Sequence, residues 1–304
     1  MDFSISFVIT NYNRGNMLVE LVDSIVQQNL TCEFEIIIVD DSSFKRKTKK
    51  SLEFIVRKYA DVTKLIINKC NLGVQKSRNI GLNLCKFKYI QVLDSDDRLT
   101  VEKGSKTPYI LNAIEFLHSN PNYAFCYSAV QMFGEFEGLT IGSYPISERD
   151  ALNKHHIQTS IVFRKADLSD CSEHYHSEIR KWQDWSFGVS ILNNRYKKNL
   201  QNRIKYFPEA NFMYRIHSAD DRISNYQISE FDMTLITITN NIEIFSSYYP
   251  ELDAHEIAKL VVSNKPCRLL DLLHMARYSL TQAYNVAQER GYVLESNTLS
   301  CEVP

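Results

Sequence analysis

Residues 5–14 read ISFVITNYNR, a run of apolar and β-branched side chains that ends abruptly in Asn, Tyr and Arg. A short run of this kind is typical of a buried strand, and the Asn residues that follow it are good turn formers. The same change occurs in FEIIIVDDSS at 34–43 and in YIQVLDSDD at 89–97. Three predicted strands therefore end in polar or charged side chains.

Predicted helices separate these strands. Apolar residues recur at helical spacing between Met17 and Val26, which indicates an amphipathic helix. We also expect helices near 48–59 and 74–84, and a further strand at 62–67. A chain that alternates strand and helix in this way folds with right-handed crossovers into a mostly parallel sheet.

The polar ends of the strands should gather at one edge of that sheet. In α/β sheets, ligands bind beyond the carboxyl ends of the strands. We therefore predict an α/β fold of Rossmann-like type, with helices flanking the sheet. We also predict that the polar clusters at 11–14, 40–43 and 94–97 share one site.

The alternation of strand and helix becomes less regular after residue 97. We expect helices at 109–118 and 182–192, and strands at 123–133, 158–163 and 211–216. From about residue 223 the chain reads as helix almost to its end, so we expect a C-terminal helical extension. Apolar residues at helical spacing form a stripe along this extension. The ordinary role of such a stripe is to pack the helix against its own domain. The stripe consists of Leu269, Leu272, Leu273, Ala276, Leu280 and Ala283.

Composition excludes several classes of protein. The 304 residues carry 35 Lys and Arg against 36 Asp and Glu, so the chain has no overall positive field for nucleic acid. No run approaches the ~18 apolar residues of a membrane-spanning helix, and the first residues lack the basic start of a signal peptide. Seven scattered cysteines without a C-x-x-C pair indicate reduced thiols. We expect a cytoplasmic protein.

One stretch stands out by its charge. Residues 45–50 read KRKTKK, five positive charges in six residues. Such a run is usually a solvated loop and helix start. The alternative is contact with an anionic membrane surface, which would place the protein peripherally at the inner face of a membrane.

The acidic turn Asp94-Ser95-Asp96-Asp97 is the first cluster whose side chains are candidates for binding or catalysis. Three carboxylates within four residues repel one another unless a cation or solvent compensates them. Oxygen ligands of this kind suit Mg²⁺ or Mn²⁺, which also accept oxygens from a substrate phosphate. A solvated acidic turn is the plain alternative, and the apolar strand before the turn favours the functional interpretation.

The second cluster is NLGVQKSRNIG at 71–81. A glycine turn that opens a helix presents free backbone N–H groups and the positive helix end, which favour a diphosphate. Arg78, about one turn into that helix, is able to add a bidentate contact to phosphate. Neither a G-x-G-x-x-G motif nor a P-loop motif occurs.

Two later motifs complete the set. In Trp182-Gln183-Asp184-Trp185 the aspartate is either a first-turn helix acid or a general base. Aromatic faces beside a carboxylate suit a sugar ring, so Trp182 and Trp185 are candidate acceptor-binding residues. His217 closes the sequence YRIH and is either a structural residue or a further ligand.

These motifs together resemble the glycosyltransferases of family 2, which have the GT-A fold. The resemblance covers residues 4 to about 220, and no single motif carries it. It rests on the order and spacing of VITNYNR at 8–14, VDDSS at 39–43, NLG with SRNIG at 71–81, VLDSDD at 92–97, WQDW at 182–185 and YRIH at 214–217.

The resemblance implies a role for each matching residue. Asp96 would be the main ligand of Mn²⁺ or Mg²⁺, with His217 helping, and Asp184 would be the catalytic base. Where the family usually has Glu before that aspartate, this chain has Gln183, so any role of the first acid is lost. The nucleotide-sugar would be bound by Thr10, Tyr12, Asp41, Arg78, Asp94 and Ser95.

The resemblance also implies a function and a division of the chain. Residues 1–100 would be the nucleotide-sugar-binding half, 101–222 the acceptor-binding half, and 223–304 the helical region. We expect an inverting transfer from a nucleotide-sugar, usually UDP-linked, to a hydroxyl of a glycan or lipid-linked glycan in the synthesis of a bacterial surface polysaccharide (capsule, O-antigen or lipopolysaccharide). A nucleotidyltransferase would show a Gly-rich loop after the first strand, which this chain lacks. A non-catalytic binding module remains the other alternative.

Overall fold

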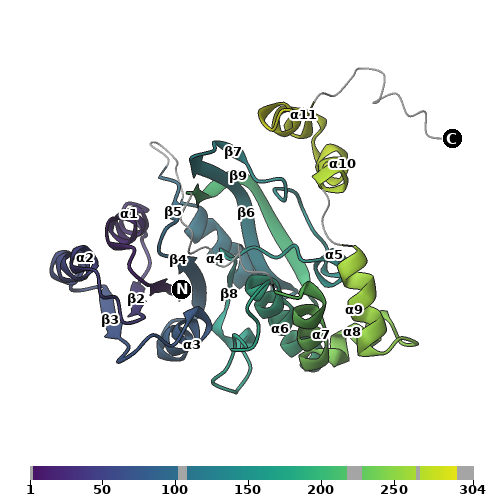
Figure 1. Ribbon diagram of the computed structural model, residues 1–304, viewed down its shortest axis with the longest axis horizontal. Coiled ribbons are helices and arrows are strands. Elements are labelled where there is room, and N and C mark those ends of the chain that lie inside the picture. The colour runs from purple at the N-terminus through teal and green to yellow at the C-terminus, as the bar shows by residue number, and fades with distance from the viewer. Residues whose placement is uncertain (1–2, 102–107, 218–227, 265–267, 293–304) are drawn as a thin grey trace.

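The computed structural model describes residues 3–101, 108–217, 228–264 and 268–292. Within them, nine strands form one sheet in the order β3-β2-β1-β4-β8-β6-β9-β5, with β7 beside β6 (Figure 1). The strands are β1 Ile5–Asn11, β2 Phe34–Asp40, β3 Thr63–Ile67, β4 Tyr89–Asp94, β5 Arg98–Leu99, β6 Tyr123–Gly134, β7 Gly138–Leu139, β8 Val162–Arg164 and β9 Arg203–Ile216.

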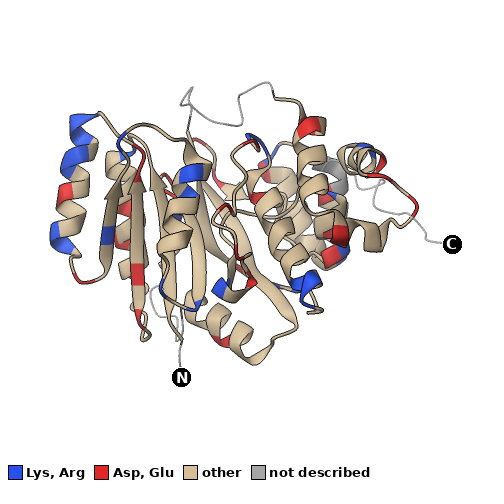
Figure 2. Ribbon diagram, turned by 90° about the horizontal axis from the view of Figure 1, so that it is seen from below, with Lys and Arg blue, Asp and Glu red and all other residues tan. Residues whose placement is uncertain are grey.

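Helices cover both faces of the sheet (Figures 1 and 2). One apolar core lies between the sheet and α1, α2 and α4. The other lies between the sheet and α3, α6 and the later helices. The helices are α1 Gly15–Val26, α2 Arg46–Lys58, α3 Val74–Leu84, α4 Tyr109–Ser119, α5 Glu148–Asn153, the 3₁₀ turn Lys165–Asp167, α6 Gln183–Lys197, α7 Glu230–Asn240, α8 Ile242–Tyr248, α9 Ala254–Ser263, α10 Arg268–Tyr278 and α11 Leu280–Glu289.

The first four strands form the parallel half of the sheet. β1 lies between β2 and β4, and its register pairs Thr10 with both Val39 and Asp94. β3 continues the parallel order beyond β2. Because these strands run in the same direction and in step, their polar carboxyl ends lie at one edge, as the sequence predicts.

The second half of the sheet is mixed. β8 is antiparallel to both β4 and β6, whereas β9 runs parallel to β6. The short strand β5 follows the acidic turn and pairs Arg98 with Met213 of β9. This pairing draws the end of β9, with Arg215 and His217, to the turn at 94–97.

The predicted α/β architecture with a C-terminal helical extension is confirmed, and the differences are local. β8 begins at Val162 instead of 158, and β9 begins at Arg203, well before the predicted 211. The short elements β5, β7, α5 and the 3₁₀ turn were not expected. The C-terminal stripe is broken between α10 and α11 at Ser279, whose side chain accepts a hydrogen bond from the backbone N–H of Gln282 and caps α11.

Helix α3 lies unusually close to the sheet at one residue. A Cβ atom built on Gly81 would lie 2.4 Å from Cγ1 of Val8 in β1, well inside van der Waals contact. Glycine therefore allows the approach that fixes α3, and with it Arg78, against the parallel strands.

The substitution Gly81→Ala should lower the free energy of unfolding by a net ~0.5–2 kcal/mol, because overpacking a core usually costs ~1–3 kcal/mol. This cost exceeds the ~0.5–1 kcal/mol that alanine normally gains over glycine inside a helix. Urea denaturation of Gly81→Ala, Val8→Ala and the double variant measures the effect. Because Val8→Ala removes the clashing methyl groups, the double variant should lose less than the sum of the two single losses. Additive losses would contradict the close contact.

Candidate functional site

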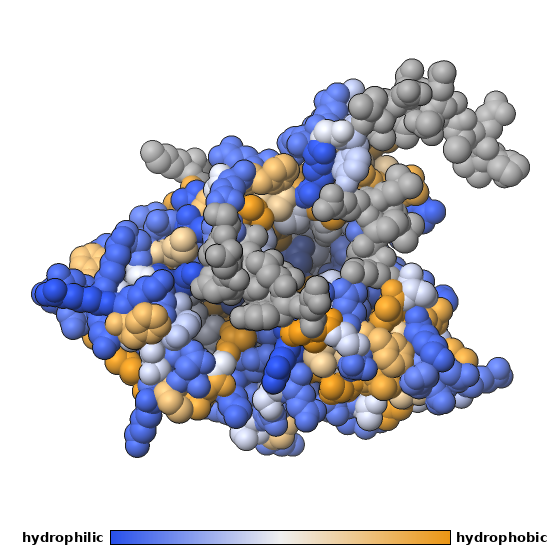
Figure 3. All heavy atoms as spheres, viewed as in Figure 1, coloured by the Kyte–Doolittle hydropathy of each residue, from blue (hydrophilic) through white to orange (hydrophobic). Residues whose placement is uncertain are grey.

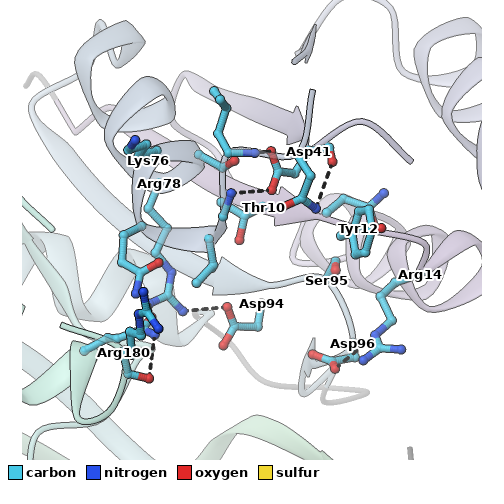
Figure 4. A pocket seen from close by; sticks show the side chains of 18 of the residues that line it. Thr10, Tyr12, Arg14, Asp41, Lys76, Arg78, Asp94, Ser95, Asp96 and Arg180 are labelled. Atoms are coloured by element: carbon cyan, nitrogen blue, oxygen red, sulfur yellow. Dashed lines mark hydrogen bonds and ion pairs between the residues drawn. The ribbon is translucent and has the colours of Figure 1, made fainter. Parts of the chain in front are cut away.

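A cavity of about 1110 Å³ opens at the carboxyl edge of the parallel strands. It is lined by residues from β1, the loop after β2, the start of α3, the acidic turn and the end of β9. Most of the side chains singled out in the sequence meet there (Figure 4). These are Thr10, Tyr12, Asp41, Arg78, Asp94, Ser95, Asp96 and His217.

Asp41 shapes the loop that opens α3. Its Oδ1 accepts hydrogen bonds from the Asn68 side chain and the Leu72 backbone, each at 2.8 Å, and its Oδ2 accepts from the Gly73 backbone at 2.8 Å. Gly73 has a φ of +88°, a conformation that glycine adopts without strain. A carboxylate has about four acceptor sites, so Asp41 retains capacity to contact a ligand while it holds the turn.

Arg78 links the two halves of the cavity. Its side chain is 4% exposed, and its Nη2 lies 2.7 Å from Oδ1 of Asp94 at the end of β4. Its Nη1 lies 3.1 Å from Oδ1 of Asp184 at the start of α6. The guanidinium also packs over the ring of Tyr175, 4.8 Å from the ring centroid. The two carboxylates outweigh burial and raise the pKa of Arg78, so the group is always charged.

Asp184 lies directly behind the cavity wall that Arg78 and Gln183 form. Its side chain is 30% exposed, and its Oδ2 accepts a hydrogen bond of 2.7 Å from the Thr159 hydroxyl. Burial raises the pKa of Asp184 above its ordinary value, and the Arg78 guanidinium and the Thr159 hydroxyl oppose this shift. Both oxygens of the carboxylate are thus oriented by neighbours on different elements.

Gln183 occupies the position where the resembled family usually has Glu. Its Oε1 accepts a hydrogen bond of 3.3 Å from Nη1 of Arg78, and its Nε2 donates to the Arg180 carbonyl at 3.4 Å. The amide therefore contacts Arg78 without adding a third negative charge beside it.

The acidic turn is held by β9. Asp97 is 1% exposed and points away from the cavity, where its Oδ1 accepts a 2.8 Å hydrogen bond from the Arg215 backbone. The Arg215 Nε donates to the Asp96 carbonyl at 2.6 Å. Burial and the charges of Asp96 and Asp94 raise the pKa of Asp97 well above its ordinary value. No role for Asp97 was predicted from the sequence, and the structure shows that it fixes the turn that presents Asp96.

Asp96 and His217 form the part of the site that suits a divalent ion. His217 Nε2 lies 3.1 Å from Asp96 Oδ2, and Arg14 Nε lies 3.6 Å from the same oxygen. In the described residues no group of three or more His, Cys, Asp or Glu side chains is arranged to hold a metal. The Asp96 carboxylate nonetheless fits Mg²⁺ or Mn²⁺ bound jointly with substrate phosphates, because Mg²⁺ is usually bound through only one or two carboxylates together with phosphate oxygens.

Trp185 differs from the sequence expectation. Trp185 is 1% exposed, and its Nε1 donates to the Ala151 carbonyl at 2.7 Å in the core. It is not able to contact an acceptor, because position 185 falls on the inward face of α6. Trp182 is partly buried and stacks on His155, with ring centroids 4.3 Å apart. Neither tryptophan lines the cavity.

Sequence reasoning assigned no role to several cations of the cavity wall, among them Lys76 and Arg180. Lys76 and Arg180 line it on the same side as Arg78, opposite Arg14 and Asp96 (Figure 4). Lys76 stands two residues before Arg78, and its exposed position at the start of α3 follows from the helix that the sequence predicts. Arg180 lies in a stretch without recognisable motifs, so no sequence signal indicated it.

Comparison with known proteins agrees with the resemblance. Residues 6–136 match the sequence model described as Glycosyl transferase family 2. An uncharacterized glycosyltransferase of Haemophilus influenzae is 32% identical over 146 residues, which is 48% of this chain and 45% of that protein. The poly(ribitol-phosphate) beta-N-acetylglucosaminyltransferase TarS of Staphylococcus aureus is 23% identical over 264 residues, 84% of this chain and 43% of TarS. The chain thus spans less than half the length of these relatives.

Solved structures show the same fold. The crystal structure of S. aureus TarS 1–349 in complex with UDP-GlcNAc has a TM-score of 0.62 and 18% identity, covering 98% of this chain and 77% of that one. The mannosyltransferase PcManGT from Pyrobaculum calidifontis, in complex with GDP-Man and Mn²⁺, has a TM-score of 0.57 and 13% identity, covering 96% and 81%. At these identities the likeness establishes the fold alone.

Replacing Arg78 with Met should destabilise the protein by about 2 kcal/mol, because two carboxylates lose a charged hydrogen-bond partner. The loss stays below that of a fully buried ion pair, since Asp94 and Asp184 are 32% and 30% exposed. Lys76→Met, an exposed position on the same helix, should change stability by less than ~0.5 kcal/mol. Urea denaturation of both variants measures the difference. Equal effects would show that Arg78 does not join the two halves.

Proposed function

We propose that this chain, which belongs to glycosyl transferase family 2, transfers a sugar from a nucleotide-sugar donor to a hydroxyl group of an acceptor. The observation that carries the proposal is Arg78, a residue of the cavity wall that joins Asp94 at the acidic turn to a second carboxylate, Asp184, directly behind that wall. In this arrangement the Arg78 side chain sets the distance between Asp94, on the side where the donor diphosphate would bind, and Asp184, which would act as the base. The relative TarS, crystallised with UDP-GlcNAc, supports a UDP-linked donor.

The donor would lie along the parallel strands. Tyr12 and Asp41 at the ends of β1 and β2 offer an aromatic face and a carboxylate to the base, and Thr10 and Ser95 offer hydroxyl groups nearby. The backbone N–H groups at the start of α3 favour a diphosphate there. Asp96 and His217 would hold Mn²⁺ or Mg²⁺, which as a Lewis acid neutralises the leaving diphosphate. The neighbour PcManGT, solved in complex with GDP-Man and Mn²⁺, supports the presence of a divalent metal.

Asp184 would act as the general base. The acceptor oxygen attacks the anomeric carbon, its proton passes to an oxygen of Asp184, and the bond from the carbon to the diphosphate oxygen breaks. Arg78 and Thr159 keep the carboxylate in one orientation during this step. A single displacement of this kind inverts the anomeric configuration.

The acceptor would be a glycan or a lipid-linked glycan of a bacterial surface polysaccharide. The names of relatives support this class, because TarS acts on poly(ribitol-phosphate) and another relative is an amylovoran biosynthesis glycosyltransferase of Erwinia amylovora, 25% identical over 198 residues. Lys76 and Arg180 give the cavity wall beside Arg78 a positive charge, which is compatible with an anionic group on either substrate.

The variant Asp184→Asn should keep donor binding and lose turnover by about 10²–10⁴-fold, the usual contribution of a general base. Release of nucleoside diphosphate from a panel of nucleotide-sugars with Mn²⁺ measures turnover, and calorimetry measures donor binding. Asp170→Asn, an exposed acid outside the cavity, is the matched control and should behave as wild type.

Turnover of Asp184→Asn within about threefold of wild type, far below the general-base range, would contradict the assignment. Donor binding by wild type without any nucleoside diphosphate release would favour a non-catalytic module. Release of pyrophosphate would favour a nucleotidyltransferase.

The pH dependence of turnover should move when the Thr159 hydroxyl is removed. That hydroxyl lowers the pKa of Asp184 by donating to the charged carboxylate, so Thr159→Val should raise this pKa. A base with a higher pKa is protonated at a higher pH, so the acid limb of the kcat profile should shift to higher pH, because the charged carboxylate loses a hydrogen bond that favours it. An unmoved limb, or a shift to lower pH, would show that Asp184 does not set it.

A further inference from the structure

The segment from Phe44 to Lys50 lies on the outer surface, between the end of β2 and the first turns of α2. The Phe44 side chain is 68% exposed, and Lys45, Arg46, Lys47, Lys49 and Lys50 are all exposed. Figure 2 shows α2 as the outermost helix at the left, with positive residues in its first turns, near the edge of the sheet where the strands end, and again in its last turn. The space-filling view has isolated apolar patches among hydrophilic side chains on this side (Figure 3).

A network of hydrogen bonds fixes the backbone of the loop that carries Phe44. Asn13 Oδ1 accepts from the backbone N–H groups of Phe44 and Lys45, each at 3.1 Å. Asp40 accepts from the Ser43 backbone at 2.9 Å and from its hydroxyl at 2.6 Å. Asn13 and Ser42 have positive φ values of 59° and 62°, which are uncommon for residues other than glycine. The backbone on both sides of Phe44 is therefore fixed by hydrogen bonds, and in this loop conformation the Phe44 side chain is left largely exposed.

The positive charges of residues 45–50 lower the stability of helix α2, whose N-terminal end carries them. Cations near a helix N-terminus are unfavourable, because that end carries the positive pole of the helix dipole. The first turn of α2 has no acidic residue, and its N-cap Lys45 makes no side-chain capping bond. In the part of the chain that the structure describes, none of the five cations has an ion-pair partner. A run that costs stability and lacks internal partners points to a partner outside the protein.

This surface is beside the donor cavity but separate from it. Phe44 does not line the cavity. Its ring contacts Tyr12 edge to face, with centroids 6.2 Å apart, and Tyr12 does line the cavity. A partner on Phe44 and the cations would therefore lie next to the cavity opening.

We propose that Phe44 and the five cations of residues 45–50 form a docking surface for an anionic lipid bilayer. Basic helix ends with exposed aromatic side chains bind such interfaces, the ring entering the headgroup region while the cations contact lipid phosphates. A soluble polyanion would satisfy the cations but leave Phe44 in water, so the ring favours the bilayer. Docking would hold the cavity at the membrane surface, where a lipid-linked acceptor resides. In the described residues no helix is long and apolar enough to span a membrane, so this surface would bind peripherally.

Sedimentation of the full chain with vesicles tests the proposal. Vesicles of phosphatidylcholine alone should bind weakly, and vesicles with about one third phosphatidylglycerol should bind in a salt-sensitive manner. Lys47→Gln/Lys50→Gln should weaken this binding about 25-fold, at about fivefold per lysine. Phe44→Ser should weaken binding at all salt concentrations. The control Lys86→Gln/Lys88→Gln removes two exposed lysines at the opposite edge, where β4 begins, and should bind as wild type.

Thermal unfolding of the same variants separates docking from misfolding. Lys47→Gln/Lys50→Gln should be at least as stable as wild type, because it removes cations from a helix N-terminus. Equal binding to both vesicle types, an equal loss in both lysine pairs, or binding to soluble polyphosphate without binding to anionic vesicles would each overturn the proposal. The assay needs no donor, so its failure leaves the proposed transfer untouched.

Discussion

A guanidinium group that is 96% removed from solvent must be paired, because an unpaired charge in a protein interior is very costly. Arg78 meets this constraint with Asp94 on one side and Asp184 on the other. The pairing fixes the relative positions of α3, β4 and α6, which come from different parts of the chain. The close packing of Gly81 on β1 holds α3 at the depth that the pairing requires. The cavity and its two carboxylate positions follow from this one side chain.

Contacts between the end of β9 and the acidic turn complete the site. β9 returns along the far part of the sheet and ends beside the acidic turn, where Arg215 contacts Asp96 and Asp97 through its side chain and backbone. This link brings His217 to Asp96. Consecutive aspartates therefore have different environments, since Asp97 is buried as a support while Asp96 faces the cavity.

Much of the fold was predictable because the parallel strands obey simple rules. Apolar runs that end in polar residues identify both the strands and the edge where Asp41, Arg78 and Asp96 meet. Contacts of long range were not predictable from local patterns. The burial of Trp185, the inward turn of Asp97 and the place of Arg180 depend on which face of α6 and which end of β9 pack inward. Likewise, the stripe of the C-terminal helices gave no sign of the break at Ser279.

The anomeric configuration of the first product is the measurement that tests this account most directly. Proton NMR follows it from an α-linked nucleotide-sugar, with water or a glycan as acceptor, before mutarotation intervenes. The account predicts a β product, because Asp184 would activate the acceptor and the displacement would occur in one step. A product that retains the α configuration would contradict it, since a single displacement assisted by one base, Asp184, inverts the anomeric carbon.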